Sequence, residues 1–269
     1  MGAMRSFGPG LVASLSAIAL LAGCAVEPDD DEAEATQLSA LESSIGFDGA
    51  VERLDEAALS RVESEAATRE ARGDTPEAVE RAASLRVLRE AKSASVAPRF
   101  SELRLQSAYD SDLVKMNGQE KALCKGARLV CVRVLLAGFR ARGAAQAQYR
   151  DGNVGGRIDA FRHTYWNALM VRAVGATHAK LWADAHENGY ADNRATPANR
   201  VQSDMDFHNN AQGRQIGSVR SRSESDTRRA VVTALETGAL RAVRYDNESD
   251  QVGRLVKSSE CTDAAPCGR

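Results

Sequence analysis

The segment from Ile158 to Val171 constrains the fold most strongly, because it is apolar around nearly the whole circumference of a helix. Asp159, His163 and Asn167 interrupt it at intervals of four, which places them in one row on a helical face. A helix that is apolar almost all round is buried, and buried polar side chains need hydrogen-bonding partners. The segment therefore predicts an interior helix of an all-α domain, in which neighbouring helices supply those partners.

Two further helices are expected to supply partners for this row. One runs from about Thr177 to Asn188, and the other begins with Ser203 as its N-cap and aligns Asp206 with Asn210. Asp206 is equally well explained as the acidic partner of Ser203 in a capping box. The segment between Asp159 and Arg214 also holds every histidine and tryptophan of the chain: His163, His178, His186, His208, Trp166 and Trp182. These residue types suit proton transfer and metal ligation, so the segment is the expected working site.

The polar residues of these helices are the candidates for chemistry. The candidate ligands for Zn²⁺ or another divalent metal are His163, His186, Asp206 and His208. The candidate catalytic residues are His163, Asp159, Asp184, Glu187, Asp206 and Asn210. The candidate substrate-binding residues are Arg162, Asn167, Asn209 and Arg214. His178 lies near a helix start and is expected to stay outside the site.

The first residues have the order of a bacterial lipoprotein signal peptide. Arg5 supplies positive charge, Leu11–Leu20 is the apolar stretch, and Leu-Ala-Gly-Cys at 21–24 resembles a lipobox. Cys24 is therefore the expected lipidation site and the membrane anchor. The alternative is an ordinary signal peptide that is cleaved at a nearby small residue. Ala25 follows the cysteine instead of Asp, so the outer membrane or periplasmic side is favoured over the inner membrane.

Five parts are expected along the chain. They are the signal peptide at 1–23, an acidic flexible tether at 24–37, a helical accessory segment at 38–104, the helical His/Asp-cluster domain at 105–257, and a cysteine-containing tail at 258–269. Thr75 and Pro76 predict a helix start, and Pro98 predicts a break. A net charge of −2 gives no reason to expect a nucleic-acid partner.

Four cysteines besides Cys24 predict two disulfides in an exported chain. The segment from Gln119 to Arg142 predicts one amphipathic helix, on which Cys124 and Cys131 would lie about 10 Å apart, too far to be bridged. Either this helix breaks near Gly126, or each of the two cysteines pairs with the tail, which carries Cys261 and Cys267. Beyond the cluster, a helix is expected over 226–237 and extended pieces over 240–245 and 251–257.

These features together predict a hydrolase of the cell envelope that acts on a phosphoester or lipid. With a metal, the ion would activate water while Glu187 or Asp184 handles the proton. Without a metal, His163 would be the general base, oriented by Asp206 or Asp159. The alternatives are a non-catalytic envelope lipoprotein, whose polar core is structural or binds a ligand, and a toxin- or effector-type module.

Three ordered motifs resemble an uncharacterised bacterial domain family found in secreted proteins, lipoproteins and toxin-like proteins. They are Asp-Ala-Phe-Arg-His-Thr-Tyr-Trp-Asn from 159, Asp-Ala-His-Glu from 184, and Met-Asp-Phe-His-Asn-Asn from 205 with Gly213 and Arg214. The resemblance covers roughly Glu120 to Leu240 and implies no established reaction. It implies that the signature comprises Asp159, His163, Asn167, Asp184, His186, Glu187, Asp206, His208, Asn209, Asn210 and Arg214. His178 is not part of it.

Overall fold

The computed structural model describes residues 30–96, 116–149, 154–189, 194–247, 250–262 and 264–268. The signal peptide, the lipidation site Cys24 and the break expected at Pro98 lie outside these residues. The described part is all-α, with nine helices and one two-stranded sheet. The helices are α1 (Asp30–Ile45), α2 (Phe47–Val51), α3 (Glu56–Arg72), α4 (Pro76–Val96), α5 (Gly118–Gly126), α6 (Arg128–Gln148), α7 (Arg157–Asn188), α8 (Pro197–Gly217) and α9 (Glu224–Glu236). None of these helices is long and apolar enough to cross a membrane.

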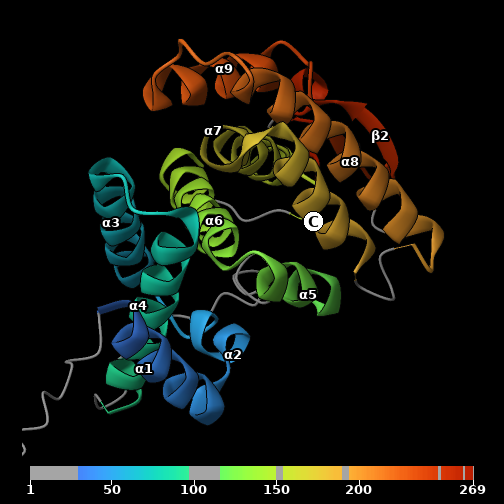
Figure 1. Ribbon diagram of the computed structural model, residues 1–269. Coiled ribbons are helices and arrows are strands. Elements are labelled where there is room, and N and C mark those ends of the chain that lie inside the picture. Colours follow the sequence, from blue (N-terminus) through green and yellow to red (C-terminus); the bar gives the residue numbers. More distant parts are fainter. Residues whose placement is uncertain are drawn as a thin grey trace, which may run out of the picture.

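The helices α1 to α4 lie together on one side of α6, and α7, α8 and α9 lie on the other side (Figure 1). Within the first group, α3 packs against α4 and contacts α6. Asp55 caps α3 by accepting a hydrogen bond from the Ala58 amide at 2.8 Å. The helix start predicted at Thr75 is confirmed, because its hydroxyl accepts from the Ala78 amide at 3.3 Å and Pro76 opens α4.

The helix α7 is the centre of the second group and contacts α5, α6, α8 and α9. Its backbone is non-helical at Gly175 (φ +82°, ψ 163°), so α7 consists of two helical segments, one around His163 and one around His186. That backbone conformation favours glycine, because a Cβ would be strained there. His163 and His186 therefore lie on the two separate helical segments predicted for them, which meet at this kink.

The predicted start of the third helix at Ser203 is wrong. The helix α8 begins at Pro197, with the Thr196 hydroxyl accepting a hydrogen bond from the Asn199 amide at 3.1 Å. A threonine followed by proline is a stronger start signal than an isolated serine, because proline fits the first helical position. Ser203 is consequently a buried residue inside the helix, and Asp206 has no capping role.

The segment predicted as helical from Gln119 to Arg142 forms two helices, α5 and α6, and not one. Ala127 adopts a non-helical conformation (φ −152°, ψ 81°) and separates α5 from α6. This corner brings the Cα atoms of Cys124 and Cys131 within 4.8 Å, and the two residues form a disulfide. Of the two alternatives for these cysteines, the break near Gly126 is confirmed.

The C-terminal part forms a small sheet that packs beside α8. The strands β1 (Arg241–Arg244) and β2 (Arg254–Lys257) pair antiparallel, with Arg241 opposite Lys257. A 3₁₀ turn, η2 (Ser258–Glu260), follows, and Cys261 pairs with Cys267 at a Cα separation of 5.4 Å. The extended pieces expected in this region are confirmed.

Candidate functional site

The predicted polar row on α7 is buried as expected. The relative exposures are 5% for Asp159, 3% for His163 and 0% for Asn167. The row faces α8, which supplies Asp206 and Asn210. An α-helical domain with a buried His/Asp/Asn cluster is therefore present.

Two glycines of α8 allow this close approach. A Cβ at Gly213 would lie 2.2 Å from the Thr164 carbonyl oxygen, and a Cβ at Gly217 would lie 2.4 Å from the Ala168 carbonyl oxygen. The two helix backbones therefore touch where any larger residue would hold them apart. This contact sets the distance across which side chains of α7 and α8 reach one another.

Asp159, His163 and Asp206 converge at this crossing. The Nε2 atom of His163 lies 3.3 Å from Oδ1 of Asp159 and 3.6 Å from Oδ1 of Asp206. One ligand atom from each residue lies within 4.8 Å of the other two. Ligands of a tetrahedral zinc ion are about 3.3–3.6 Å apart, given bonds of about 2.0–2.2 Å. The separations from Nε2 thus suit two ligands of one ion.

The other ring nitrogen of His163 faces a third carboxylate. Its Nδ1 lies 3.5 Å from Oε1 of Glu187, which is within ion-pair range, although the geometry is not that of a hydrogen bond. Glu187 accepts a hydrogen bond from the Asn210 amide at 3.1 Å, and Asn210 accepts one from Asn167 at 2.7 Å. Among the described residues, Nδ1 of His163 and Oδ1 of Asp206 are buried without a hydrogen-bond partner.

The two aspartates of this cluster have opposite electrostatic surroundings. Burial by itself would raise the pKa of Asp159, but the Arg162 guanidinium, His163 and the Gly155 amide outweigh it, so the pKa is lowered. Arg162 donates to Asp159 at 2.6 Å, and the Gly155 amide donates at 2.8 Å. Burial raises the pKa of Asp206 well above its usual value, and Glu187 and Asp159 raise it further against the opposing effect of Arg162.

His186 belongs to a neighbouring buried pair that includes a residue absent from the sequence-based candidates. Its Nδ1 lies 2.9 Å from Oε1 of Glu120 on α5, and its ring packs edge-on against Trp166 and 6.0 Å from the His163 ring. Burial lowers the pKa of His186, but Glu120 and Glu187 outweigh it and the net shift is upward. Asn117 and Glu120 have capping-box spacing in the sequence, but that spacing does not reveal the histidine that Glu120 contacts.

The remaining predicted site residues have other partners. The Nε2 atom of His208 lies 2.9 Å from the Ala239 carbonyl oxygen, and the Asn209 amide makes two 2.9 Å hydrogen bonds to the Arg241 backbone. Arg214, in contrast, reaches the polar row and donates to Asn167 at 3.0 Å, and Asp184 pairs with Lys180. His178 is exposed and outside the cluster, as expected. Of the four candidate metal ligands, His163 and Asp206 are in the triad, Asp159 completes it, and His186 and His208 are not in it.

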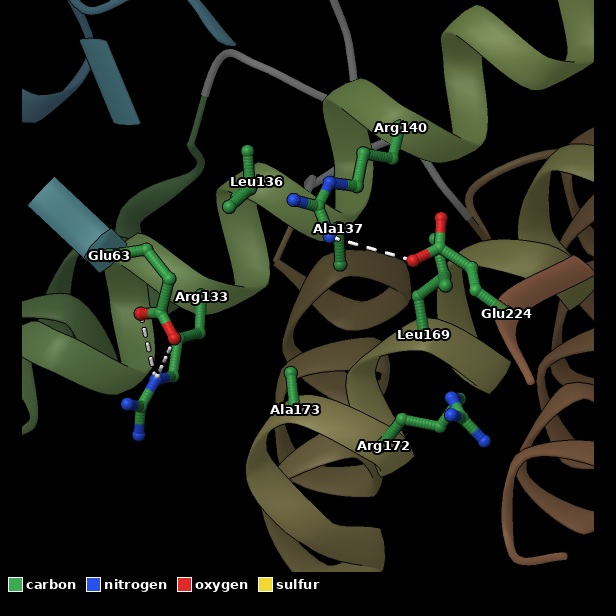
Figure 2. A pocket seen from close by; sticks show the side chains of 9 residues that line it. All are labelled: Glu63, Arg133, Leu136, Ala137, Arg140, Leu169, Arg172, Ala173 and Glu224. Atoms are coloured by element: carbon green, nitrogen blue, oxygen red, sulfur yellow. Dashed lines mark hydrogen bonds and ion pairs between the residues drawn. The ribbon is translucent and has the colours of Figure 1, made fainter. Parts of the chain in front are cut away.

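A pocket of about 200 Å³ lies elsewhere and is lined by residues of α3, α6, α7 and α9. Figure 2 shows Arg133 paired with Glu63 on one side of it and Arg140 paired with Glu224 on the other. Its floor is formed by small and aliphatic side chains such as Ala137 and Leu169. The pocket shares no residue with the triad.

Residues 121–239 match a family model described as Domain of unknown function (DUF6973). The match is consistent with the uncharacterised family expected from the motifs, and it includes Asp159, His163 and Asp206. Glu120 directly precedes its first matched residue. No curated protein and no solved structure matches the chain.

Proposed function

We propose that the chain is a metal-dependent hydrolase that acts on a phosphoester or lipid substrate at the cell envelope. The observation that carries this proposal is the convergence of buried Asp159 and His163 with partly buried Asp206 at one point. Imidazole and carboxylate groups are common ligands of catalytic zinc, and three protein ligands leave a further position open for water or substrate. A metal bound there would lower the pKa of its water to about 7 and so supply the nucleophile.

The charge of the cluster supports a divalent cation. When ionised, Asp159, Glu187 and Asp206 contribute three negative charges, and Arg162 contributes one positive charge. The remaining excess of two negative charges is buried, where uncompensated charge is costly. A divalent ion would balance it and would favour the ionised form of Asp206.

The second nitrogen of His163 supports the same assignment. Histidines that bind metals usually direct their other ring nitrogen at a carboxylate or carbonyl, which fixes the ring and its tautomer. Glu187 lies at this position, and Asn210 and Asn167 hold it through a chain of hydrogen bonds. In this proposal Asp159, His163 and Asp206 hold the ion, and Glu187 orients His163.

The position of Arg162 supports an anionic substrate group. Its Nη2 atom lies 3.5 Å from Nε2 of His163, and its Nε is buried without a hydrogen-bond partner among the described residues. A guanidinium beside the reacting group can bind the oxygens of a phosphoryl or carboxyl group through paired hydrogen bonds. Arg162 is accordingly the proposed substrate-binding residue closest to the metal ligands.

The metal-free form of the same hydrolase is the second candidate. It is favoured by the contact of Arg162 with Oδ1 of Asp159, because the guanidinium already supplies this carboxylate with a positive charge that a metal would otherwise supply. His163 would then take the proton from water, and Asp206 near its Nε2 would orient it. We further propose that a lipid on Cys24 anchors the domain on the outer-membrane or periplasmic side, with envelope lipids or small molecules as substrates.

Elemental analysis of the purified chain beside its His163→Ala variant tests the metal form. His178→Ala is the matched control, because His178 is exposed and its ring contacts the Val174 carbonyl oxygen and not a residue of the cluster. We expect near-stoichiometric zinc or another divalent metal in the wild type and the control, and its loss from His163→Ala. The second measurement is hydrolysis with and without EDTA. The substrates are p-nitrophenyl phosphate, bis(p-nitrophenyl) phosphate and p-nitrophenyl acyl esters.

Equal metal content in His163→Ala, or none in the wild type, would overturn the metal form. Hydrolysis that resists EDTA but is lost in His163→Ala would then support the metal-free form. Hydrolysis that persists in His163→Ala would reject both forms.

A further inference from the structure

The short helix α5 closes the C-terminal end of α7. The last four carbonyls of a helix have no partner within that helix. The Asn117 side chain donates to two of them in α7, to Ala185 at 2.9 Å and to His186 at 3.3 Å. The oxygen of the same side chain accepts from the Gln119 and Glu120 amides and so caps the start of α5. A single buried amide therefore joins the start of one helix to the end of another.

Glu120 makes a second link between the same two helix ends. One carboxylate oxygen accepts from the Asn117 amide at 2.8 Å, and the other lies 2.9 Å from Nδ1 of His186. Glu120 is only 5% exposed, so water does not screen this contact. The disulfide of Cys124 joins α5 in turn to α6.

These links act on the turn that carries Glu187. His186 and Glu187 are adjacent, so the backbone that α5 holds at Ala185 and His186 also determines where the Glu187 carboxylate lies. That carboxylate faces Nδ1 of His163 at 3.5 Å. A displacement of the turn by even 1 Å, a distance that commonly matters at functional sites, would remove this contact.

We propose that Glu120 is a positioning residue of the centre, which holds the last turn of α7 so that Glu187 stays against His163. It acts through His186 and the helix end and does not touch the substrate. The proposal rests on the proposed function, because only that function makes the cluster a metal centre. The effect of Glu120 on the position of His163 can be tested without a metal.

The test compares the wild type with Glu120→Gln in the full chain and uses Glu80→Gln as the matched control. Glu80 also accepts a helix-start amide, that of Arg128 at 2.8 Å, but its hydrogen bond is to α6 and not to α7. The first measurement is the nitrogen NMR spectrum of the imidazole rings without metal, in which the chain's four histidines can be assigned. The second is the dissociation constant for Zn²⁺ from competition with a chelating dye.

We expect Glu120→Gln to change the ring signals of His163 as well as those of His186, and to weaken zinc binding about tenfold, the lower end of the range for residues behind the ligands. Glu80→Gln should change neither. Asn117→Ser is the second variant, because serine can still cap α5 but its short hydroxyl cannot replace the amide donor to the α7 carbonyls. Asn117→Ser should change the ring signals of His163 in the same direction as Glu120→Gln.

Unchanged His163 signals in both Glu120→Gln and Asn117→Ser would overturn the proposal, as would equal changes in Glu80→Gln. Absence of zinc binding by the wild type would instead reject the proposed metal centre. The imidazole spectra would still decide whether Glu120 positions His163. The failures of the two proposals are therefore distinguishable.

Discussion

Gly213 gives the sharpest test of the close contact between α7 and α8. Substituting Gly213 by alanine would place a Cβ 2.2 Å from the Thr164 carbonyl oxygen and 2.8 Å from the Asn167 Cβ. The first of these contacts is with the backbone, which cannot rotate away as a side chain can. The helices α7 and α8 must therefore separate, since a carbon–oxygen contact needs about 3.3 Å and the shortfall is about 1.1 Å.

The cost follows from what that separation breaks. The hydrogen bond from Asn167 to Asn210, now 2.7 Å, would lengthen beyond the hydrogen-bonding range, as would that from Arg214 to Asn167, now 3.0 Å. Overpacking costs about 1–3 kcal/mol, and leaving a buried amide unpaired costs about another 1–3 kcal/mol. The better helix propensity of alanine returns about 1 kcal/mol. The expected net loss in the free energy of unfolding is about 3 kcal/mol.

Denaturant unfolding followed by the fluorescence of the buried Trp166 and Trp182 measures this loss. Gly143→Ala is the matched control, because Gly143 lies in α6 with nothing within 4 Å of an added Cβ. It should stabilise the chain by about 0.5–1 kcal/mol. A Gly213→Ala variant at least as stable as the wild type would refute the close crossing and the network built on it.

Three further predictions concern the cluster, the disulfide and an ion pair. His163→Asn should abolish hydrolysis and leave the melting temperature nearly unchanged; a clear fall in melting temperature would instead favour the structural reading of the cluster. Serine at both Cys124 and Cys131 should weaken zinc binding, because α5 would lose its link to α6, and equilibrium dialysis would measure this; unaltered affinity would separate the disulfide from the site. The hydrogen bond from Arg61 lowers the pKa of Glu90, so Glu90→Gln should destabilise the chain by less than about 1 kcal/mol at pH 7. Stability from a lowered pKa is lost as pH falls through it, so the difference in urea midpoints should vanish in acid, and a constant difference would contradict the assignment.

The polar row on α7 could be predicted because helical spacing depends only on local sequence. Asp159, His163 and Asn167 had to share a face once the surrounding residues were helical. The residues that α8 supplies to this row were predicted in part. Asp206 and Asn210 reach the row, but neighbouring Asn209 binds the β1 backbone. One residue along a helix turns a side chain by about 100°, so adjacent residues can have unrelated roles.

Contacts between distant segments could not be predicted in this way. Glu120 and His186 are 66 residues apart, and nothing in the spacing of either segment indicates that they meet. The break at Ala127 was only one of two alternatives, because alanine favours helix and gives no sign of a break. The break becomes evident only from the disulfide between Cys124 and Cys131. The glycines of α8 were visible in the sequence, but their meaning depends on Thr164 and Ala168 of another helix.

The α7–α8 crossing combines features that a design for stability alone would avoid. A helix-interior glycine costs about 1 kcal/mol relative to alanine, and α8 has one at the contact, Gly213. The same contact places three carboxyl groups beside one guanidinium, and it leaves Asp206 with an oxygen that accepts no hydrogen bond from the described residues. Apolar side chains would fill this space at lower cost. Local departures from stability rules are expected where a site needs a particular geometry, and here they coincide at the point where the metal-ligand atoms of Asp159, His163 and Asp206 converge.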